Sequence, residues 1–537
     1  MIARLQTTRD LVAAALVLQR RGLIDLRRPN EAIRASKALR RYGSFGGLVT
    51  HTAARYGDDP ALTDDAGTLS FRDLEWASNA LARGFARRGV GVGSVVGILV
   101  RNHRALWLAL GAAGKVGARV VLLNTGFAAP QLADVCAREN ISAVIADQEF
   151  TSLLEVLPAA VERIGGWRDD AAIRPTLDSI ADDEWPDPLP APGRVGGMVL
   201  LTSGTTGTPK GAPRDKVSPL QSAQLLDRIP WPANGTYCVA APMFHATGLA
   251  TCALGLALGN RVVLARRFEP EATLASIADY EASTLILVPT MLQRILDLGR
   301  DVLARYDTSA LKVVFAAGSA LSPDLCRRTR EAFGDVLYNL YGSTEVAVAA
   351  VATPSELRAA PGTVGRPPVG CTLAAYDEQR RRITEPGRTG TLFVSSGLSF
   401  SGYTDGGHKE IVDGLLSSGD TGHFTADGLW FVDGRDDDMI VSGGENVFPL
   451  EVENLLADHP AVVEACVLGV DDDDFGKRLR AFVVRQPDAE LDADGVRTHV
   501  RSALARHKVP RDVVFLDSLP RNETGKVLKG VLRKEYR

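Results

Sequence analysis

The densest group of residues that could do chemistry is a run rich in glycine and hydroxyl side chains at residues 200–211, LLTSGTTGTPKG. It holds three glycines, five Ser or Thr residues and one lysine, Lys210. Glycine-rich loops bring backbone N–H groups close to phosphate oxygens, and hydroxyls and a lysine add donors and positive charge. The run is not a Walker A loop, because Pro209 stands where that pattern needs glycine and Gly211 where it needs Ser or Thr. It predicts a phosphate-binding loop of another kind, although such runs can also be ordinary loops.

Five further segments combine aromatic, acidic or basic residues with glycine. In chain order they read APMFHATGL (241–249), YNLYGSTE (338–345), SSGDTGHF (417–424), GRDDDMIVSGGENVFPLEVE (434–453) and PRNETGKVLKGVLR (520–533). Taken singly, each has an ordinary explanation: a core histidine, a surface glutamate, a Gly–Asp turn or a solvated lysine. What points to a function is that all five segments follow residues 200–211 in this order.

Together the six segments resemble the signature motifs of the adenylate-forming enzymes, the superfamily of acyl- and aryl-CoA synthetases, and the resemblance covers about residues 45–533. It implies a two-step reaction. A carboxylate attacks the α-phosphate of ATP to give acyl-AMP and pyrophosphate, and a thiol then displaces AMP. The implied cofactors are ATP, Mg²⁺ and coenzyme A as a co-substrate.

The resemblance also implies a set of nucleotide-binding residues. They are Thr202, Ser203, Gly204, Thr205, Thr206, Gly207, Thr208, Lys210, Gly318, Ser319, Asn339, Tyr341, Gly342, Thr344, Asp420 and Arg435. Tyr341 would stack on adenine, and Asp420 would accept hydrogen bonds from the ribose hydroxyls. Lys210 would either bind phosphate or anchor its loop, and the sequence leaves these alternatives open.

Four residues are implied as catalytic: Lys526, Glu345, His245 and Thr205. Glu345 and Thr205 would hold Mg²⁺, since a hard cation needs only one or two protein ligands when substrate phosphates complete its shell. Lys526 would bridge the substrate carboxylate and the α-phosphate, where an ammonium offsets the repulsion between two anions.

The acceptor site and the hinge are implied by residues 434–453. Gly443 and Gly444 would present a face to the pantetheine of CoA, because glycine lets a narrow chain approach the backbone closely. Asp437 matches the hinge position, about which the small domain would rotate between the two steps.

The elements that must position these residues alternate between strands and helices. Strand patterns lie at 94–100, 118–124, 141–147, 311–318 and 336–342, and helical patterns at 104–114, 130–139 and 323–333. This alternation predicts an α/β fold with parallel sheets. Residues 236–260 carry no Asp, Glu, Lys or Arg, and we interpret them as a buried strand followed by a core helix rather than a membrane span.

The chain of 537 residues is too long for one hydrophobic core. We expect a large N-terminal domain of several subdomains with parallel-rich sheets, plus a small, mobile α+β C-terminal domain. The expected boundaries are a basic helical arm at 1–44, a large AMP-binding domain at 45–433, a hinge at 434–438 and a small domain at 439–537.

The arm differs in charge from the rest of the chain. Residues 1–41 contain ten Lys or Arg against three Asp or Glu, while the whole chain has a net charge of −4. Leu11, Ala15 and Leu18 share one helical face, which predicts a helix packed on the main domain. The alternative is a peripheral membrane contact, since basic amphipathic helices are drawn to anionic lipid.

The remaining composition is that of an ordinary cytoplasmic protein. Six scattered cysteines form no C-x-x-C pair, so neither a disulfide framework nor a zinc site is indicated. The slightly negative net charge gives no reason to expect nucleic acid as a partner. The sequence does not predict an oligomeric state.

The acid to be activated is the least determined part of the function. Phe244 and His245 stand where amino-acid-activating relatives carry Asp, which argues against an α-amino acid. Small residues flank His245 and Gly318, namely Ala246, Gly248, Ala250, Ala316, Ala317 and Ala320. Because small linings leave room for an alkyl chain, we predict a medium- or long-chain fatty acid. A fatty acyl-AMP ligase that loads a carrier protein and a non-catalytic nucleotide-binding module are the alternatives.

Overall fold

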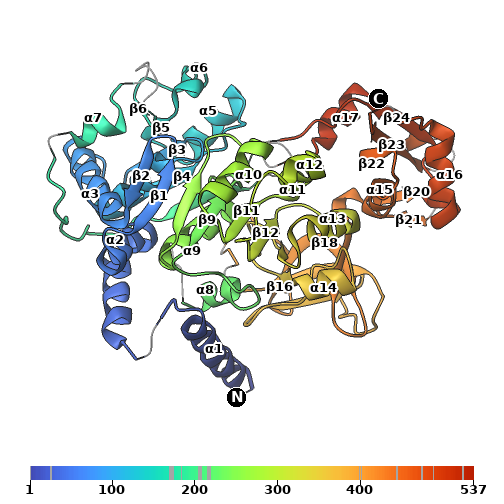
Figure 1. The fold of residues 1–537 in the computed structure, drawn as a ribbon, viewed down its shortest axis with the longest axis horizontal. Helices are drawn as coiled ribbons and strands as arrows, with labels where there is room; N and C mark the ends of the chain where they lie inside the picture. Colours follow the sequence, from blue (N-terminus) through green and yellow to red (C-terminus); the bar gives the residue numbers. More distant parts are fainter. Residues whose placement is uncertain are drawn as a thin grey trace.

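The computed structural model describes residues 2–24, 27–167, 174–182, 184–202, 209–214, 219–397, 399–400, 402–442, 445–472, 476–487, 489–522 and 525–536. Figure 1 shows a large body that contains most of the chain and a smaller body formed by the last hundred or so residues. The expected α/β architecture, with a large N-terminal domain and a smaller C-terminal one, is confirmed.

Two large sheets form the large body within these residues. The first has the order β14 (Ala350–Ala352), β13 (Leu337–Tyr341), β12 (Val313–Ala317), β11 (Thr284–Leu287), β9 (Thr236–Val239), β10 (Arg261–Leu264), β1 (Pro60–Asp64), β2 (Gly67–Ser70). The second has the order β6 (Glu162–Gly165), β5 (Ala143–Ala146), β3 (Val95–Leu99), β4 (Arg119–Leu122), β7 (Met198–Thr202), β8 (Lys210–Arg214). Their central strands pair in parallel. Strands such as β12 are wholly buried and apolar, as expected where helices cover both faces.

Helices separate and cover the two sheets. They are α2 (Pro29–Tyr56), α3 (Phe71–Arg87), α4 (Arg104–Val116), α5 (Ala129–Arg138), α6 (Thr151–Leu154), α7 (Leu177–Ala181), α8 (Pro219–Leu226), α9 (Ala246–Ala257), α10 (Pro270–Asp279), α11 (Pro289–Leu296), α12 (Arg300–Leu303), α13 (Pro323–Phe333) and α14 (Pro354–Ala359). One apolar core, which includes side chains of α3, α4 and α9, joins the inner faces of both sheets. A second lies under α10, α11 and α13 on the outer face of the first sheet. The strand and helix expected at 236–260 are β9 and α9.

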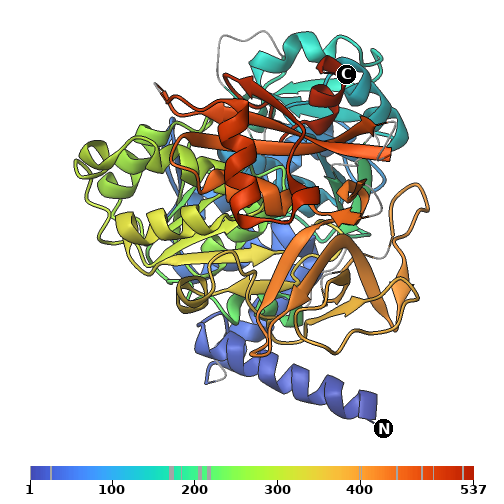
Figure 2. The same ribbon diagram turned by 90° about the vertical axis from the view of Figure 1, so that its right-hand side faces the viewer.

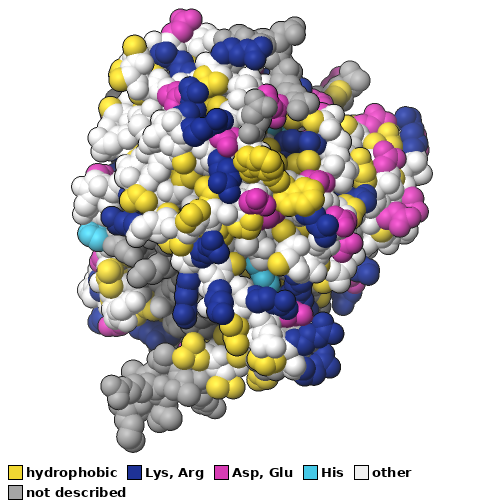
Figure 3. All heavy atoms as spheres, turned by 90° about the vertical axis from the view of Figure 1, so that its left-hand side faces the viewer, with side chains coloured by type: hydrophobic (Ala, Val, Ile, Leu, Met, Phe, Trp, Pro, Cys, Tyr) yellow, Lys and Arg dark blue, Asp and Glu magenta, His cyan; other side chains and the backbone are white. Residues whose placement is uncertain are grey.

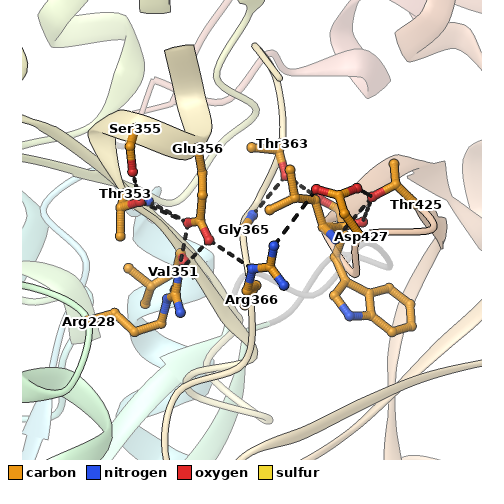
Figure 4. Close-up of polar contacts among 12 residues, drawn as sticks. Arg228, Val351, Thr353, Ser355, Glu356, Thr363, Gly365, Arg366, Thr425 and Asp427 are labelled. Carbon is orange, nitrogen blue, oxygen red and sulfur yellow. Dashed lines mark hydrogen bonds and ion pairs between the residues drawn. The ribbon is translucent and has the colours of Figure 1, made fainter. Parts of the chain in front are cut away.

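A third, antiparallel sheet packs against the end of the first. Its strands are β15 (Thr372–Tyr376), β16 (Gly390–Ser395), β17 (Ile411–Val412), β18 (Leu415–Phe424) and β19 (Trp430–Arg435). Figure 4 shows how Glu356 fixes this junction: it accepts hydrogen bonds from Arg228 at 2.6 Å and Arg366 at 3.0 Å. Arg366 also pairs with Asp427 in the turn before β19, at 3.8 Å. This network links the first and third sheets at their junction, where the candidate site lies.

The C-terminal domain is a small α+β unit. It contains β20 (Ile440–Ser442), β21 (Glu445–Val447), α15 (Pro449–Ala457), β22 (Val462–Asp472), β23 (Gly476–Arg485), α16 (Ala493–Ala503), β24 (Asp512–Leu516) and α17 (Lys529–Glu535). One core packs α15 and α16 against β22–β24, and another lies under α17 on the other face. Between β19 and β20 lies a single 3₁₀ turn, Asp436–Asp438.

The N-terminal arm begins with α1 (Ile2–Arg20), which projects from the base of the body (Figures 1 and 2). Its C-terminal half packs beside α8, and Arg21 donates hydrogen bonds to the carbonyl oxygens of Leu226 and Asp227. The expected packing of Leu11 is wrong: Leu11 is 53% exposed, whereas Ala14 and Leu18 are buried. Residues 14 and 18 lie one turn apart, so the helix is rotated relative to the face that we expected.

Candidate active site

The carboxyl ends of parallel strands place most of the candidate residues at one edge of the first sheet. His245 follows β9, Gly318 and Ser319 follow β12, and Tyr341 ends β13. In open α/β sheets this edge is where ligands bind, because successive strand ends and loops converge there. Thr202 ends β7 of the second sheet and faces the same cleft.

A cleft of about 3780 Å³ runs between the two domains along this edge. The described candidate residues line it, namely His245, Thr202, Lys210, Gly318, Ser319, Asn339, Tyr341, Gly342, Thr344, Glu345, Asp420, Arg435 and Lys526. The sequence-based choice of these residues and the geometry therefore select one place in the molecule.

The two ends of the glycine-rich loop are held by a strand pair. Thr202 in β7 stands opposite Lys210 in β8, while candidates Ser203, Gly204, Thr205, Thr206, Gly207 and Thr208 lie outside the described residues. The Lys210 ammonium lies 3.5 Å from the Asp405 carboxylate and 5.0 Å from the centre of the Tyr403 ring. In this structure Lys210 therefore anchors its loop to the segment 403–405.

Glu345 is held by two hydroxyl groups. Tyr403 Oη donates a hydrogen bond to Glu345 Oε1 at 2.8 Å, and Ser343 Oγ donates to Oε2 at 3.0 Å. Burial and the neighbouring Glu345 raise the pKa of the Tyr403 phenol, so Tyr403 stays a donor. Among the described residues no cluster of three or more His, Cys, Asp or Glu side chains could hold a metal ion. A cation at Glu345 would thus take most of its ligands from substrate oxygens.

Tyr341 and Asp420 meet across the junction of the first and third sheets. Tyr341 Oη donates to Asp420 Oδ2 at 2.7 Å, and Arg435 lies 3.5 Å from Asp420 Oδ1. Burial raises the pKa of the Asp420 carboxyl, although Tyr341, Arg435, Lys526 and Lys409 oppose this shift. The arrangement places a carboxylate with one close guanidinium beside an aromatic ring, a combination that could hold a nucleoside.

Lys526 reaches the cleft from the C-terminal domain at the end of a tight turn. Lys526 N–H donates to Asn522 Oδ1 at 2.9 Å, and Gly525 N–H donates to the Asn522 carbonyl at 2.8 Å. The side chain projects into the open cleft and remains in contact with solvent. Desolvation by the walls of the cleft and the positive charge of Arg435 lower the pKa of Lys526, while the negative charges of Asp420 and Glu345 oppose that shift.

Gly525 is where this turn touches the large domain. Its φ of +73° lies in the left-handed region, and a Cβ there would overlap the hydroxyl and Cβ of Thr290 in α11. Only glycine fits both the backbone conformation and the close approach. The contact seats Lys526 in the cleft.

His245 precedes α9 and lies against the Phe244 ring, with 4.4 Å between ring centres. Burial lowers its pKa to about 4, and the positive charge of Lys526 adds to the shift. Its Nε2 is buried and has no hydrogen-bond partner among the described residues. Because buried polar atoms are normally paired, a ligand in the cleft is the natural partner.

A second buried polar atom without a hydrogen-bond partner among the described residues lies at the end of β12. Ser319 Oγ is buried and lacks a protein hydrogen-bond partner within the described part of the chain. Gly318 before it has φ +98°, which turns the chain so that residue 319 follows the strand end. His245 Nε2 and Ser319 Oγ, the two atoms without partners, belong to residues that line one cleft. This indicates that a polar group of a ligand binds there.

Some expectations remain untested. Gly443 and Gly444 lie outside the described residues, so their role toward CoA stays a prediction, as does the hinge at Asp437. Of the small residues expected to line the acyl site, Ala246, Ala250, Ala317 and Ala320 do so, but Gly248 and Ala316 do not border the cleft. Gly248 packs on the backbone of Pro242 and Ala316 belongs to the core under α11 and α13.

Sequence reasoning missed three residues of the site: Tyr403, Lys409 and Thr290. Tyr403 stands in a turn-rich stretch without helical or strand periodicity, 58 residues from its partner Glu345. Nothing local in the sequence marks such a contact. Lys409 and Thr290 are likewise recognisable only from their neighbours in space.

Comparisons with known proteins identify the family of this chain. The family model described as AMP-binding enzyme matches residues 49–404, and that described as AMP-binding enzyme C-terminal domain matches residues 451–526. An indoleacetate–CoA ligase of Aromatoleum aromaticum is 30% identical, over 87% of this chain and 93% of its own length. A medium/long-chain-fatty-acid–CoA ligase, FadD8 of Mycobacterium tuberculosis, is 29% identical, over 96% and 95%.

A solved structure resembles the whole fold. The o-succinylbenzoate CoA synthetase of Bacillus subtilis, in complex with its acyl-adenylate intermediate, has a TM-score of 0.78 and 25% identity, over 90% of this chain and 97% of that one. The chain therefore belongs to the AMP-binding, adenylate-forming enzyme family. The three relatives named here are acyl- and aryl-CoA ligases, and their names give chemically different acids.

Proposed function

We propose that this enzyme activates a medium- or long-chain fatty acid with ATP and transfers the acyl group to CoA, releasing pyrophosphate and AMP. The observation that supports the activation step best is the convergence of Lys526, Asp420, Glu345 and His245 on one cleft. No simpler function explains why a lysine from the small domain is seated among the acidic groups of the large one.

The nucleotide would lie along the carboxyl edge of the first sheet. Tyr341 would pack on the adenine, and Asp420 with Arg435 would hold the ribose. The loop 203–208 would hold the β- and γ-phosphates. Glu345 would hold Mg²⁺ together with Thr205, and the cation would neutralise phosphate charge during the attack.

Lys526 would act in the first step only. The substrate carboxylate and the α-phosphate are both anions, and Lys526 would neutralise them as they approach. The neutral imidazole of His245 would orient the carboxylate through Nε2 without adding a second charge. Breaking the α–β phosphate bond releases pyrophosphate and leaves acyl-AMP.

The thioester step would use another face of the small domain. Rotation about Asp437 would withdraw Lys526 and bring Gly443 and Gly444 toward the acyl carbon, where the CoA sulfur displaces AMP. We expect Lys526→Ala to lose pyrophosphate release from acid and ATP by at least about a hundredfold. The same variant should convert supplied acyl-AMP and CoA to thioester at a near-normal rate. Equal loss in both half-reactions would contradict domain alternation.

The acyl group would lie along α9. Ala246, Ala250, Ala253 and Ala257 border the cleft and recur at a spacing of one helical face. This face is about 17 Å long at 1.5 Å per residue. An extended chain advances about 1.2 Å per bond, so the face can accommodate about fourteen carbons. Val288, Phe315 and Leu340 add apolar lining.

A panel of acids tests the substrate class. Each buried methylene contributes about 0.8 kcal/mol, so kcat/KM measured by pyrophosphate release should rise about fourfold per added carbon until the α9 face is covered. Aromatic acids, such as indoleacetate or o-succinylbenzoate, should be poorer substrates than acids of ten or more carbons. Better turnover of an aromatic or short acid than of every fatty acid would refute the substrate assignment. Supplying CoA or a holo-carrier protein in parallel separates the proposed acceptor from its alternative.

We also propose a cytoplasmic enzyme that contacts membranes through its arm. All six cysteines lie within the described residues and are unpaired, as expected in a reducing compartment. No helix among the described residues has the length and apolar character to cross a bilayer, so the contact would be peripheral.

A further inference from the structure

The cleft does not end at the α9 face. It continues to the N-terminal arm, where Leu18, Leu23, Ile24, Ala35 and Leu39 line it. α2 packs beside α9, so this part of the cleft is the distal extension of the proposed acyl site. The candidate nucleotide-binding residues and the arm thus line one continuous cleft.

The arm carries a stripe of exposed apolar side chains, and no other described residue covers them. Leu11, Val12 and Leu16 on α1 are 53%, 57% and 61% exposed. Ile33 and Leu39 on α2 are also exposed, at 50% and 44%. Figures 1 and 2 show α1 projecting from the base of the body, and the exposed fractions show that these side chains face solvent.

Basic side chains accompany this stripe. Arg20, Arg34 and Lys37 are exposed and make no ion pair or hydrogen bond with the described residues. Residues 1–41 hold ten basic against three acidic residues. On the face shown in Figure 3, Lys and Arg side chains are interspersed with hydrophobic ones in the lower half, where few acidic side chains appear.

We infer that the α1–α2 arm docks on an anionic lipid bilayer and that the acid enters the cleft from this lipid-facing end. The inference rests on the proposed function for the identity of the acid, but the docking itself does not. Apolar side chains would enter the interface while arginine and lysine face anionic headgroups, as in interfacial helices. The acid would then reach His245 along α9 without crossing water.

The charge of the arm decides between a bilayer and other occupants. A second copy of this chain would bring a second strongly basic arm against the first, and like charges oppose such pairing. A nucleic acid would use the arginines but would leave Leu11, Val12 and Leu16 in water. An anionic bilayer satisfies both the charge and the apolar stripe.

Vesicle binding of the full-length enzyme tests the inference. We expect binding to vesicles of equal parts phosphatidylcholine and phosphatidylglycerol, weak binding to phosphatidylcholine alone, and release at high salt. One basic residue near an anionic surface contributes roughly fivefold to partitioning. R20Q/R34Q/K37Q should therefore bind about a hundredfold more weakly. A triple variant elsewhere on the surface, K312Q/R382Q/R501Q, is the matched control and should bind as wild type.

A second variant tests the apolar stripe without changing charge. L11S/V12S/L16S should also bind the mixed vesicles at least tenfold more weakly. Turnover of palmitate dissolved in the vesicles should fall with both arm variants, while turnover of dissolved octanoate stays within about twofold of wild type. Octanoate turnover also reports that the variants are folded.

Three results would overturn the inference. The first is wild-type binding to anionic vesicles by both arm variants. The second is a dimer in solution that either arm variant dissociates, because the stripe would then be a subunit interface. The third is equal loss of octanoate and palmitate turnover. If wild type binds vesicles but turns over no fatty acid, the docking stands and the proposed substrate is wrong.

Discussion

If the proposed domain rotation occurs, the contact between Gly525 and Thr290 should allow a single added methyl group to impair one half-reaction and spare the other. Gly525→Ala adds a Cβ that overlaps the Thr290 side chain. It also places a non-glycine residue at φ +73°, which costs roughly 1–2 kcal/mol. The turn that carries Lys526 must then shift away from α11.

The effect should be large in the first step only. A misplacement of about 1 Å in a catalytic group costs roughly a hundredfold in rate, so pyrophosphate release from acid and ATP should fall by about that factor. Thioester formation from supplied acyl-AMP and CoA should stay within about threefold of wild type, because the proposed rotation would move Gly525 away from Thr290.

Relief of the overlap provides the control. Thr290→Ala removes the hydroxyl and methyl groups nearest the added Cβ, so the double variant G525A/T290A should recover about tenfold in adenylation. The backbone strain at residue 525 remains, and recovery should be incomplete. If Gly525→Ala slows both half-reactions equally, or if Thr290→Ala gives no relief, the seating of Lys526 against α11 is not what positions it.

Three further predictions concern the same cleft. Desolvation by the walls of the cleft and the charge of Arg435 lower the pKa of Lys526. Because the proposed first step needs its charged form, adenylation kcat/KM should fall as pH rises through a value below the ordinary 10.5; a limb at or above 10.5 would contradict this. Tyr403→Phe removes a hydrogen bond to a carboxylate, worth about 1.5–3 kcal/mol, and should lower adenylation at least tenfold and raise the Mg²⁺ needed. Tyr376→Phe, which loses a similar bond to the remote Asp413, should not; equal effects would remove Tyr403 from the site. Ala253→Phe should cut kcat/KM for long acids by at least tenfold and for short acids far less, whereas Ala272→Phe on exposed α10 should change neither; uniform loss would place the chain elsewhere.

The sequence predicted the fold wherever local pattern and burial agree. The helix expected at 104–114 is α4, Arg104–Val116, and the strand expected at 311–318 is β12, Val313–Ala317. The type of such an element follows from the spacing of its apolar residues, which can be read from a single sequence. The end of β22 at Asp472 was not foreseen, because pairing with β23 rather than hydrophobicity extends it.

The site was predictable as far as its motifs reach. Asp420 and Tyr341 were chosen separately, and the structure joins them by a hydrogen bond. The partners of Glu345 and the seat of Lys526 were not predictable, since Tyr403 and Thr290 act through contacts between distant segments. The exposed side of α1 was mistaken for the same reason: α8, far along the chain, determines which face is buried.

The electrostatics of the cleft explain why its lysine comes from a separate domain. Lys526 is one cause of the low pKa of His245, and burial is the larger one. With this low pKa His245 is neutral near pH 7. In the proposed mechanism it would therefore bind the acid without adding a charge, and Lys526 would be the ammonium between the carboxylate and the α-phosphate. A lysine fixed there would also hold the departing AMP in the second step and oppose its release. In the proposed mechanism, carrying Lys526 on a domain that withdraws would give the first step its charge and would leave the second step without it. The turn at Gly525, which touches the large domain closely but is not covalently tied to it, is suited to that reversible placement.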